Sequence, residues 1–402
     1  MSDEKVKPPA QSSAPETKGV IPGKEPKGGG LEGMIAGDSA ICFIDGLKGI
    51  LRYRGYDIAE LSAGATFEEV VWLLWHGELP RAAELQSFRA ELAAATVVPP
   101  AVVTAMKAIP TSIHPMSALR TLISAAGNVD PDAECPPADR AANLRKAGRL
   151  LAQTSAITAA WDRHRNGKPL VAADPQLSFA ANFLFMLRGE RASDVNARVF
   201  DECLILHADH EFNASTFTAR VIAATLADLH SALVGAIGAL KGPLHGGANT
   251  AVMQMLLEID KQGGAPIAGE WLKKALAAKQ KIMGFGHRVY KTDDPRATRL
   301  KALSEIVAEQ PGAERKWFEL SGAVAKALAE QKNLPANVDF YSASTYYVLG
   351  IPPDLYTPIF AISRTSGWAA HVLEQFANNR LIRPLSNYVG PAPRPYVKLD
   401  QR

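Results

Sequence analysis

One stretch of the sequence, residues 281–296, concentrates groups that could bind a ligand and move a proton. It reads Lys-Ile-Met-Gly-Phe-Gly-His-Arg-Val-Tyr-Lys-Thr-Asp-Asp-Pro-Arg. The glycines on either side of Phe285 leave backbone that a flat ligand can approach closely. His287 follows them, and Tyr290 and Arg296 add a hydroxyl and a cation. The apolar spacing of a helix is missing, which predicts a loop between helices, where chemistry is often found. By itself the stretch fits a basic surface turn with a chance histidine equally well.

Two further turns supply a second histidine and a carboxylate. His245 lies in the glycine-rich run 242–249, just before a helix predicted over Ala248–Ile259. The positive end of that helix disfavours a charged imidazole, and a neutral imidazole can donate a hydrogen bond to a developing oxyanion. Asp339 lies between apolar residues in 337–342, where partial desolvation raises the pKa of a carboxyl and makes it a useful base. Two histidines and a carboxylate in three separate turns form a candidate acid–base set.

The runs that carry these residues read Gly-Pro-Leu-His-Gly-Gly-Ala-Asn, Gly-Phe-Gly-His-Arg-Val-Tyr and Asn-Val-Asp-Phe-Tyr-Ser-Ala, in that order. Together they resemble the citrate synthase family, and in particular its short bacterial branch, which includes 2-methylcitrate synthase. The similarity covers roughly residues 31–402. The resemblance implies carbon–carbon bond formation between an acyl-CoA and a 2-oxo acid, followed by thioester hydrolysis. It implies that Asp339 takes a proton from the acyl α-carbon, that His245 stabilises the enol oxygen, and that His287 assists at the carbonyl of oxaloacetate.

The resemblance also maps a set of oxaloacetate-binding residues. They are His210, Arg296, Arg364 and Arg383. A planar guanidinium suits this task because it grips a carboxylate with two parallel hydrogen bonds. His207 and His210 could instead be spaced as metal ligands, but no cysteine or third ligand is near in sequence, so we expect no metal site and a structural role for His207. The resemblance places Arg383 in the active site of a neighbouring subunit, which implies a homodimer.

Coenzyme A needs an adenine site and partners for its phosphates. The resemblance assigns the adenine to the backbone of one short segment, formed by Lys281, Ile282, Met283, Gly284 and Phe285. Lys291 and Arg288 are candidates for the phosphates, and the sequence does not rank them. We expect no permanently bound cofactor, with acetyl-CoA or CoA entering only as co-substrate.

Composition excludes several other classes of protein. The chain has 402 residues, 47% of them hydrophobic, with a net charge of +3 and a pI of about 8.6. This balance does not suggest a nucleic-acid binder, which usually shows a concentrated basic face. The three cysteines show neither metal-ligand spacing nor a disulfide framework, which favours a reducing, cytoplasmic compartment. Asp228 and His230 interrupt the apolar stretch 221–240, so we expect a buried helix there and no membrane span.

The pattern of apolar residues predicts a mainly α protein. Residues 1–30 are too polar to bury a core and are predicted to be a disordered tail. Ser39–Tyr53, with Asp45-Gly46 at its centre, predicts the only strand pair. A capping box at Thr66–Glu69 opens a helix that runs to Gly77. The other helices are predicted at 81–95, 101–108, 117–126, 138–166, 178–188, 194–207, 215–240, 248–259, 297–309, 314–331 and 356–378.

The resemblance divides these helices between two domains with the active site in the cleft. A large helical domain comprises residues 31–245 and 344–402, and a small helical domain comprises 246–343. The helix predicted over 215–240 is rich in alanine and glycine, and the family's matching helix packs across the dimer. Relatives often have Asp after His-Pro-Met, whereas this chain has Ser117, which we interpret as a substitute N-cap.

Three alternatives to a citrate synthase remain open from the sequence. A lyase acting on citryl-CoA shares the glycine–histidine motifs, but such enzymes usually carry extra domains for which this chain has no room. A non-catalytic scaffold of the same fold would be expected to lack a catalytic residue, and none is missing. A 2-methylcitrate synthase uses propionyl-CoA in place of acetyl-CoA, and the motifs do not separate the two. Acetyl-CoA is favoured because it is the commoner substrate of the fold.

Overall fold

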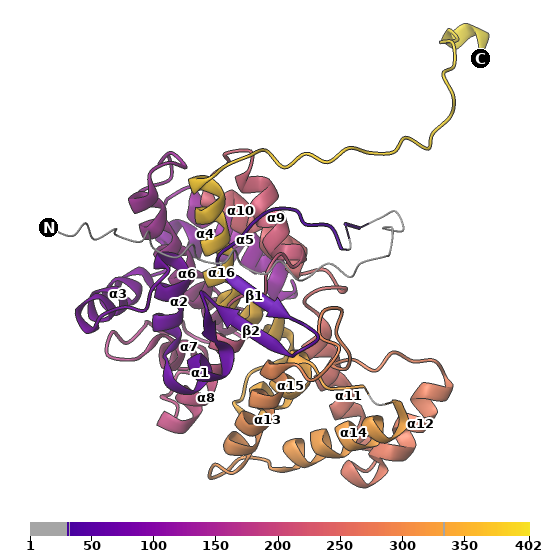
Figure 1. The fold of residues 1–402 in the computed structure, drawn as a ribbon. Coiled ribbons are helices and arrows are strands. Elements are labelled where there is room, and N and C mark those ends of the chain that lie inside the picture. Colours follow the sequence, from indigo (N-terminus) through magenta and orange to yellow (C-terminus); the bar gives the residue numbers. More distant parts are fainter. Residues whose placement is uncertain (1–29, 32, 333) are drawn as a thin grey trace, which may run out of the picture. The chain divides into compact units, whose positions relative to one another are not determined.

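Helices dominate the part of the chain that the computed structural model describes, namely residues 30–31, 33–332 and 334–402 (Figure 1). Ala40–Arg402 form one compact unit. The described residues that precede it are exposed and contain no helix or strand. The disordered tail predicted for residues 1–30 lies, apart from Gly30, outside the described residues.

The helices of the described chain span most of its length. Their bounds are α1 Ile58–Gly64, α2 Phe67–His76, α3 Ala82–Ala95, α4 Pro100–Ala108, α5 Pro115–Gly127, α6 Arg140–Arg165, α7 Phe179–Arg188, α8 Asp194–His207, α9 Ala214–Ala223, α10 Leu229–Leu240, α11 Ala248–Gln262, α12 Ala268–Ala277, α13 Pro295–Ala308, α14 Lys316–Lys332, α15 Val338–Val348 and α16 Tyr356–Ala377. Short 3-10 helices lie at η1 Ala265–Ile267, η2 Pro353–Leu355 and η3 Leu399–Gln401. The prediction of a mainly α fold is confirmed.

The predicted strand pair is present and is joined by a third short strand. β1 (Cys42–Asp45) pairs antiparallel with β2 (Ile50–Tyr53), with Cys42 opposite Tyr53. β3 (Tyr56–Asp57) then pairs with β2, so the prediction of a single strand pair missed one strand. Two residues are too few to leave a period in the sequence, which explains the omission.

Local sequence signals fix many helix ends as predicted. The Thr66 capping box is formed, because Glu69 accepts from the Thr66 backbone N–H at 2.8 Å. Gly77 ends that helix in the left-handed conformation that a glycine adopts without strain. Ser178 caps the start of α7 by accepting from the Ala181 N–H. The predicted helices 81–95, 194–207 and 356–378 match observed helices to within one residue at each end.

Three predictions of secondary structure are wrong. The helix predicted over 215–240 is two helices, α9 and α10, because Leu226 takes a left-handed backbone (φ 65°) and Asp228 caps α10 by accepting from the Ser231 N–H. Ser117 does not cap α5, since the His114 ring accepts from the Met116 N–H and Pro115 occupies the first turn. The predicted third turn, around Asp339, is the start of a helix, α15.

A long buried helix, α16, forms the centre of the core. It packs against α2, α5, α6, α8, α9 and α10, and from Tyr356 to Leu373 every residue is buried. Helices α11 to α15 pack chiefly against one another, and contact the rest of the unit mainly through α13, which meets α8 and α1, and through α11, which meets α16. The proposed division into a large and a small domain stays a prediction.

The described helices were also compared with the length and hydropathy of a membrane span. No single one is both long and apolar enough to cross a bilayer. The pair α3 and α4, which is bent by 47°, meets the requirement by length and composition alone.

Candidate active site

His245 is held as a neutral imidazole with a defined tautomer. Its Nε2 accepts from the backbone N–H of Ser215 at 3.2 Å and lies 2.8 Å from the Ser215 hydroxyl. That hydroxyl donates to Asn213 and accepts from the Trp368 ring N–H. Since the backbone N–H can only donate, the ring proton of His245 is on Nδ1. Burial, helped by the charge of Arg364, lowers the pKa of His245 to about 4.

The helix that controls the His245 ring is α9 and not the one predicted. Ser215 is the second residue of α9, so the ring nitrogen faces N–H groups at the positive end of that helix. These groups disfavour a second proton on the ring. The sequence predicts this effect at the start of α11, which begins after Gly247. The role of Ser215 was missed because nothing in the sequence links it to a histidine thirty residues later.

His287 is also neutral, with the opposite tautomer. Its Nδ1 accepts from the backbone N–H groups of Val289 (3.0 Å) and Tyr290 (3.2 Å). The ring proton is therefore on Nε2, where it can be donated to a ligand. Burial and then the charge of Arg296 lower the pKa of this ring to about 4. The two predicted histidines are thus both hydrogen-bond donors at neutral pH.

Asp339 occupies the first turn of α15, where the Asn337 side chain caps the helix by accepting from the Asp339 N–H at 3.0 Å. Burial raises the pKa of Asp339 to about 6, and the charges of Arg296 and Arg364 oppose that rise. The carboxyl is therefore mostly ionised at neutral pH and is also a stronger base than an exposed aspartate.

Arg296 is almost completely buried, at 2% exposure, and is paired with an aspartate that sequence reasoning missed. Asp294 caps α13 and binds the guanidinium twice, through Nε at 3.0 Å and a terminal nitrogen at 2.8 Å. Burial lowers the pKa of Arg296 but this partner outweighs it, so the pKa is raised overall. The Asp-Pro-Arg sequence that opens a helix was the available signal, because Asp before Pro is a common N-cap.

His210 lies beside the His287 loop. The ring centroids of His210 and His287 are 5.4 Å apart, and His210 Nε2 lies 3.3 Å from the Tyr290 hydroxyl. The guanidinium of Arg296 lies 5.6 Å from the centroid of the Tyr290 ring. Burial and the charge of Arg296 lower the pKa of His210 well below its ordinary value. Residues predicted from two distant segments of the sequence are therefore brought together.

Arg364 comes from the middle of α16 and is 1% exposed. Its Nε donates to the His207 carbonyl at 2.8 Å, and its guanidinium lies over the Phe360 ring. Its charge contributes to the pKa shifts of His245 and Asp339. These couplings connect Arg364 to two of the predicted catalytic residues.

His207, for which we expect a structural role, contacts its own helix. Its ring is buried and its Nδ1 lies 2.7 Å from the Cys203 carbonyl, one turn earlier in α8. Burial lowers the pKa of this ring to about 3. Across the described part of the chain, no group of three or more His, Cys, Asp or Glu side chains is arranged to hold a metal ion.

Arg383 is the one predicted substrate-binding residue that the single chain does not bring to this cluster. It is exposed and lies past the end of α16, in a segment that runs without helix or strand as far as η3 (Figure 1). Among the described residues it has no hydrogen-bond or ion-pair partner. Large apolar side chains of the same segment are exposed as well, including Leu385 at 89% and Val389 at 88%.

The segment predicted to receive adenine, Lys281–Phe285, is tied to the residues that start α15. Phe285 forms an isolated bridge with Ala336, and the Asn337 N–H donates to the Gly284 carbonyl at 2.9 Å. Gly284 has a φ of +84°, and a Cβ there would lie 2.7 Å from Val252 and 2.9 Å from Phe340. Only glycine fits, so the backbone that could meet a flat base is held next to the helix that carries Asp339.

The turn between β1 and β2 fixes the other side of the His287 loop. The Lys291 N–H donates to the Gly46 carbonyl at 2.8 Å. A Cβ on Gly46 would lie 2.2 Å from the Val289 carbonyl oxygen, so this close backbone approach requires glycine. Asp45-Gly46 was recognised in the sequence only as a hairpin turn, and its contact with the loop could not be foreseen.

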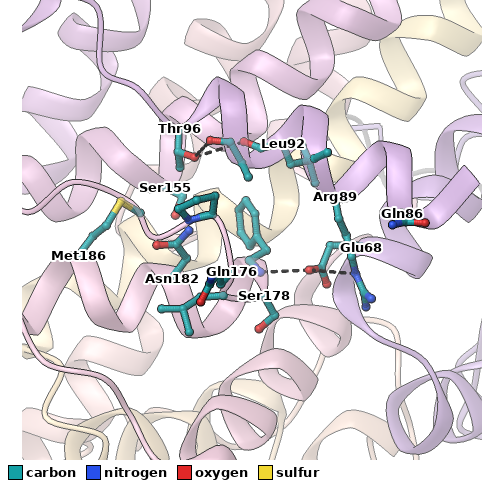
Figure 2. Close-up of a pocket in the computed structure, with 15 residues that line it drawn as sticks. Glu68, Gln86, Arg89, Leu92, Thr96, Ser155, Gln176, Ser178, Asn182 and Met186 are labelled. Carbon is teal, nitrogen blue, oxygen red and sulfur yellow. Dashed lines mark hydrogen bonds and ion pairs between the residues drawn. The ribbon is translucent and has the colours of Figure 1, made fainter. Parts of the chain in front are cut away.

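A cavity of about 420 Å³ lies apart from all of these residues. Figure 2 shows its walls, to which α2, α3, α6 and α7 contribute Glu68, Arg89, Ser155 and Asn182. The Glu68 carboxylate accepts from the Phe179 N–H at 3.0 Å and lies 3.6 Å from Arg89. None of the predicted catalytic or binding residues lines this cavity.

Known proteins similar to this chain all point to one family. The family model described as "Citrate synthase, C-terminal domain" matches residues 30–385. Citrate synthase of Haloferax volcanii is 49% identical over 93% of this chain and 98% of its own length. 2-Methylcitrate synthase of Shewanella oneidensis is 41% identical over 94% of this chain and 99% of its own. A solved citrate synthase of Thermoplasma acidophilum, in ternary complex with carboxymethyl coenzyme A and oxaloacetate, is 32% identical with a TM-score of 0.85, covering 92% of this chain and 97% of its own.

The opposite tautomers of the two histidines can be tested directly. In ¹⁵N-labelled protein at pH 7 we expect His245 to carry its proton on Nδ1 and His287 to carry it on Nε2, because backbone N–H groups occupy the other nitrogen of each ring. Two-bond ¹H–¹⁵N correlation spectra report the tautomer, and single His→Gln variants assign the signals. With pKa values of about 4, neither ring should gain a second proton until the pH approaches 4. A proton on Nε2 of His245 at pH 7 would contradict the geometry.

Proposed function

Because the chain belongs to the citrate synthase family, we propose that it is a citrate synthase, which condenses acetyl-CoA with oxaloacetate and water to give citrate and CoA. The observation that carries the proposal is the combination of one base and two neutral donors. Asp339 has a pKa of about 6, and His245 and His287 each present a ring N–H at neutral pH.

The first step is the formation of an enol from the thioester. Asp339 removes a proton from the methyl carbon next to the thioester carbonyl, and the electron pair moves onto the carbonyl oxygen. The Nδ1–H of His245 donates to that oxygen. A neutral donor suits this step, since its pKa is closer to that of an enol than the pKa of an imidazolium would be.

The second step joins the two substrates. The enol carbon attacks the ketone carbon of oxaloacetate, a carbon–carbon bond forms, and the ketone oxygen takes a proton delivered through His287 Nε2. Water then cleaves the thioester, which releases CoA as the thiol and leaves the third carboxylate of citrate. The buried cations of this site compensate for the negative charge of the dianionic substrate.

His210, Arg296 and Arg364 would hold oxaloacetate. Arg364 commits its Nε to the His207 carbonyl, which leaves its two terminal nitrogens for a carboxylate. The backbone of Lys281–Phe285 would receive the adenine of CoA, next to α15 and its Asp339. CoA is then a co-substrate and no resident cofactor takes part. This arrangement is consistent with the substrates named for the Thermoplasma complex.

We also propose that the working unit is a homodimer in the cytoplasm. The extended segment after α16 carries Arg383 together with exposed apolar side chains, which a second subunit could cover. Cys42, Cys135 and Cys203 are all free thiols, which suits a reducing compartment. A thiol-reactive probe that labels none of them when freshly lysed cells are denatured in its presence would contradict the proposed compartment.

The alternative of a 2-methylcitrate synthase keeps the same site and changes only the acyl group. We expect kcat/KM at saturating oxaloacetate to be larger for acetyl-CoA than for propionyl-CoA. The difference should be about ten- to a hundredfold, because one methylene in a pocket contributes only about 1–3 kcal/mol. A thiol-release assay with both acyl-CoA substrates measures it. A larger value for propionyl-CoA would favour the alternative, and no thiol release with either would contradict the family's activity in this chain.

Asp339 gives the reaction a defined pH dependence. Since burial raises its pKa to about 6, kcat/KM should fall as the pH decreases through 6 and the base gains a proton. Asp339→Asn should reduce kcat by about two to four powers of ten. The same substitution should not lower the melting temperature, because it removes a carboxylate whose charged form burial disfavours. Asp354→Asn is a control for an aspartate outside the site. Near-normal turnover of Asp339→Asn would exclude it as the base.

The role of Arg383 across the dimer can be tested by mixing two inactive variants. Arg383→Ala lacks the residue offered to the neighbouring site, and Asp339→Asn lacks the base of its own site. After subunit exchange, which mass measurement of the hybrid confirms, one of the two sites in each hybrid is intact. We expect activity to approach half of the wild-type value per hybrid. Exchange without recovery would show that Arg383 acts within its own chain.

A further inference from the structure

A buried chain of polar side chains runs from beside His210 toward the surface. The carboxylate of Asp209 faces Nε2 of His371, at 3.2 Å from Oδ1 and 3.3 Å from Oδ2. His371 Nδ1 lies 3.2 Å from an Arg220 nitrogen, which also donates to Glu374 at 2.7 Å. Asp209 and His371 both have 0% exposure. The same carboxylate accepts from the Glu211 N–H at 3.2 Å and from the Cys42 thiol, so His371 is the ring donor to a buried charge that several neutral groups hold.

The chain of contacts defines the tautomer of His371. A guanidinium only donates hydrogen bonds, so Nδ1 must accept from Arg220 and the ring proton lies on Nε2, toward Asp209. The ring of Phe212 packs against both members, with His371 at 5.5 Å between centroids and the Arg220 guanidinium at 4.6 Å. The contact with Arg220 therefore keeps the Nε2–H of His371 directed at the Asp209 carboxylate.

The same face of α16 holds the turn that carries Asp209. Arg364, Gly367 and His371 are three and four residues apart and so share that face. Arg364 donates to the His207 carbonyl at 2.8 Å, and the Gly367 N–H donates to the Ala208 carbonyl at 3.1 Å. A Cβ on Gly367 would lie 2.3 Å from Asp209 Oδ1, so only glycine permits this approach.

Tyr53 fixes the turn from the opposite side. Its hydroxyl donates to the Asp209 carbonyl at 2.9 Å and accepts from the Asp209 N–H at 3.2 Å. The next residue, His210, contacts Tyr290 and His287. A shift of the Asp209 backbone would therefore change the position of the His210 ring.

We propose that Asp209 and His371 are positioning residues for the 2-oxo acid site, with His371 holding the Asp209 carboxylate away from Arg364. The inference rests on the proposed function. Burial lowers the pKa of the Arg364 guanidinium, and the negative charge of Asp209 is the largest effect that opposes this. If the Nε2–H of His371 is lost, the carboxylate gains more by pairing with Arg364, and the nitrogens meant for the substrate become occupied.

Two substitutions of His371 separate this role from a packing role. His371→Asn keeps an oxygen near the position of Nδ1, which Arg220 can still donate to, but it removes the donor to Asp209. His371→Gln keeps an N–H near the position of Nε2 and so keeps that donor. Both remove the ring from the same core position and should lower the melting temperature.

Calorimetry of oxaloacetate binding without acyl-CoA separates the two roles, because a loss of core packing by itself would not change this Kd. We expect its Kd to rise about ten- to a hundredfold in His371→Asn, as for a lost hydrogen bond to a charged group, and to stay within about threefold of wild type in His371→Gln. The KM for oxaloacetate should follow Kd, and the KM for acetyl-CoA at saturating oxaloacetate should change much less. Equal changes in the two variants, or an unchanged Kd in His371→Asn, overturn the inference.

A third variant decides the matter if His371→Asn does not fold. His371→Leu removes the donor to Asp209 and fills the place of the ring with an apolar side chain, while Arg220 keeps its ion pair with Glu374, so the Kd for oxaloacetate should again rise. An unchanged Kd in this variant overturns the inference. Wild-type protein that neither binds oxaloacetate nor releases thiol contradicts the proposed function, and with it the inference. Wild-type activity with unaffected variants contradicts the inference alone.

Discussion

Two guanidinium groups buried in one site are the constraint on which the rest of this structure depends. Taking an ion out of water costs on the order of several kcal/mol, and leaving it without a partner costs more. Arg296 meets the requirement locally, through the double contact with Asp294. Arg364 has only the His207 carbonyl as a hydrogen-bond partner among the described residues and relies on the more distant charge of Asp209. Asp294 thus compensates the first arginine, whereas the two terminal nitrogens of the second have no hydrogen-bond partner among the described residues.

The same positive field explains how the acid–base groups take their working states. Burial alone would raise the pKa of Asp339 further, but the charges of Arg296 and Arg364 limit the rise to about 6. For the histidines, burial and the arginines act in the same direction, and the pKa values of His245 and His287 fall to about 4. One set of charges thereby leaves the carboxyl ionised and the imidazoles neutral at the same pH.

The sequence singled out candidate site residues but not the groups that contact them. His245, His287 and Asp339 stood out because glycine-rich runs and isolated polar residues are local features. Ser215, Asp294 and His371 did not, because each acts through contacts formed only when distant segments meet. The break between α9 and α10 was missed for a related reason: Asp228 has a helix-cap side chain, but within an alanine-rich stretch it looked like an interruption of a single helix. The helical fold was predictable because amphipathic spacing and caps repeat along the chain.

The contacts of the site separate its residues into two groups with few polar links between them. His287 and Asp339 belong to segments that bond to each other, through Gly286 with Pro335 and Asn337 with Gly284. Arg364 lies on α16, His245 contacts Ser215 at the start of α9, and His210 lies in the turn just before α9. Links between the two groups include the 3.3 Å contact of His210 with Tyr290, the Lys291 bond to Gly46 and the Arg299 ion pair with Glu202 at 2.7 Å. Oxaloacetate would contact both groups, Arg364 in one and Arg296 in the other. Its binding should therefore favour the arrangement that brings the two groups closest. We therefore expect acyl-CoA to bind weakly until oxaloacetate is in place, and calorimetry showing equal acyl-CoA affinity with and without oxaloacetate would contradict this coupling.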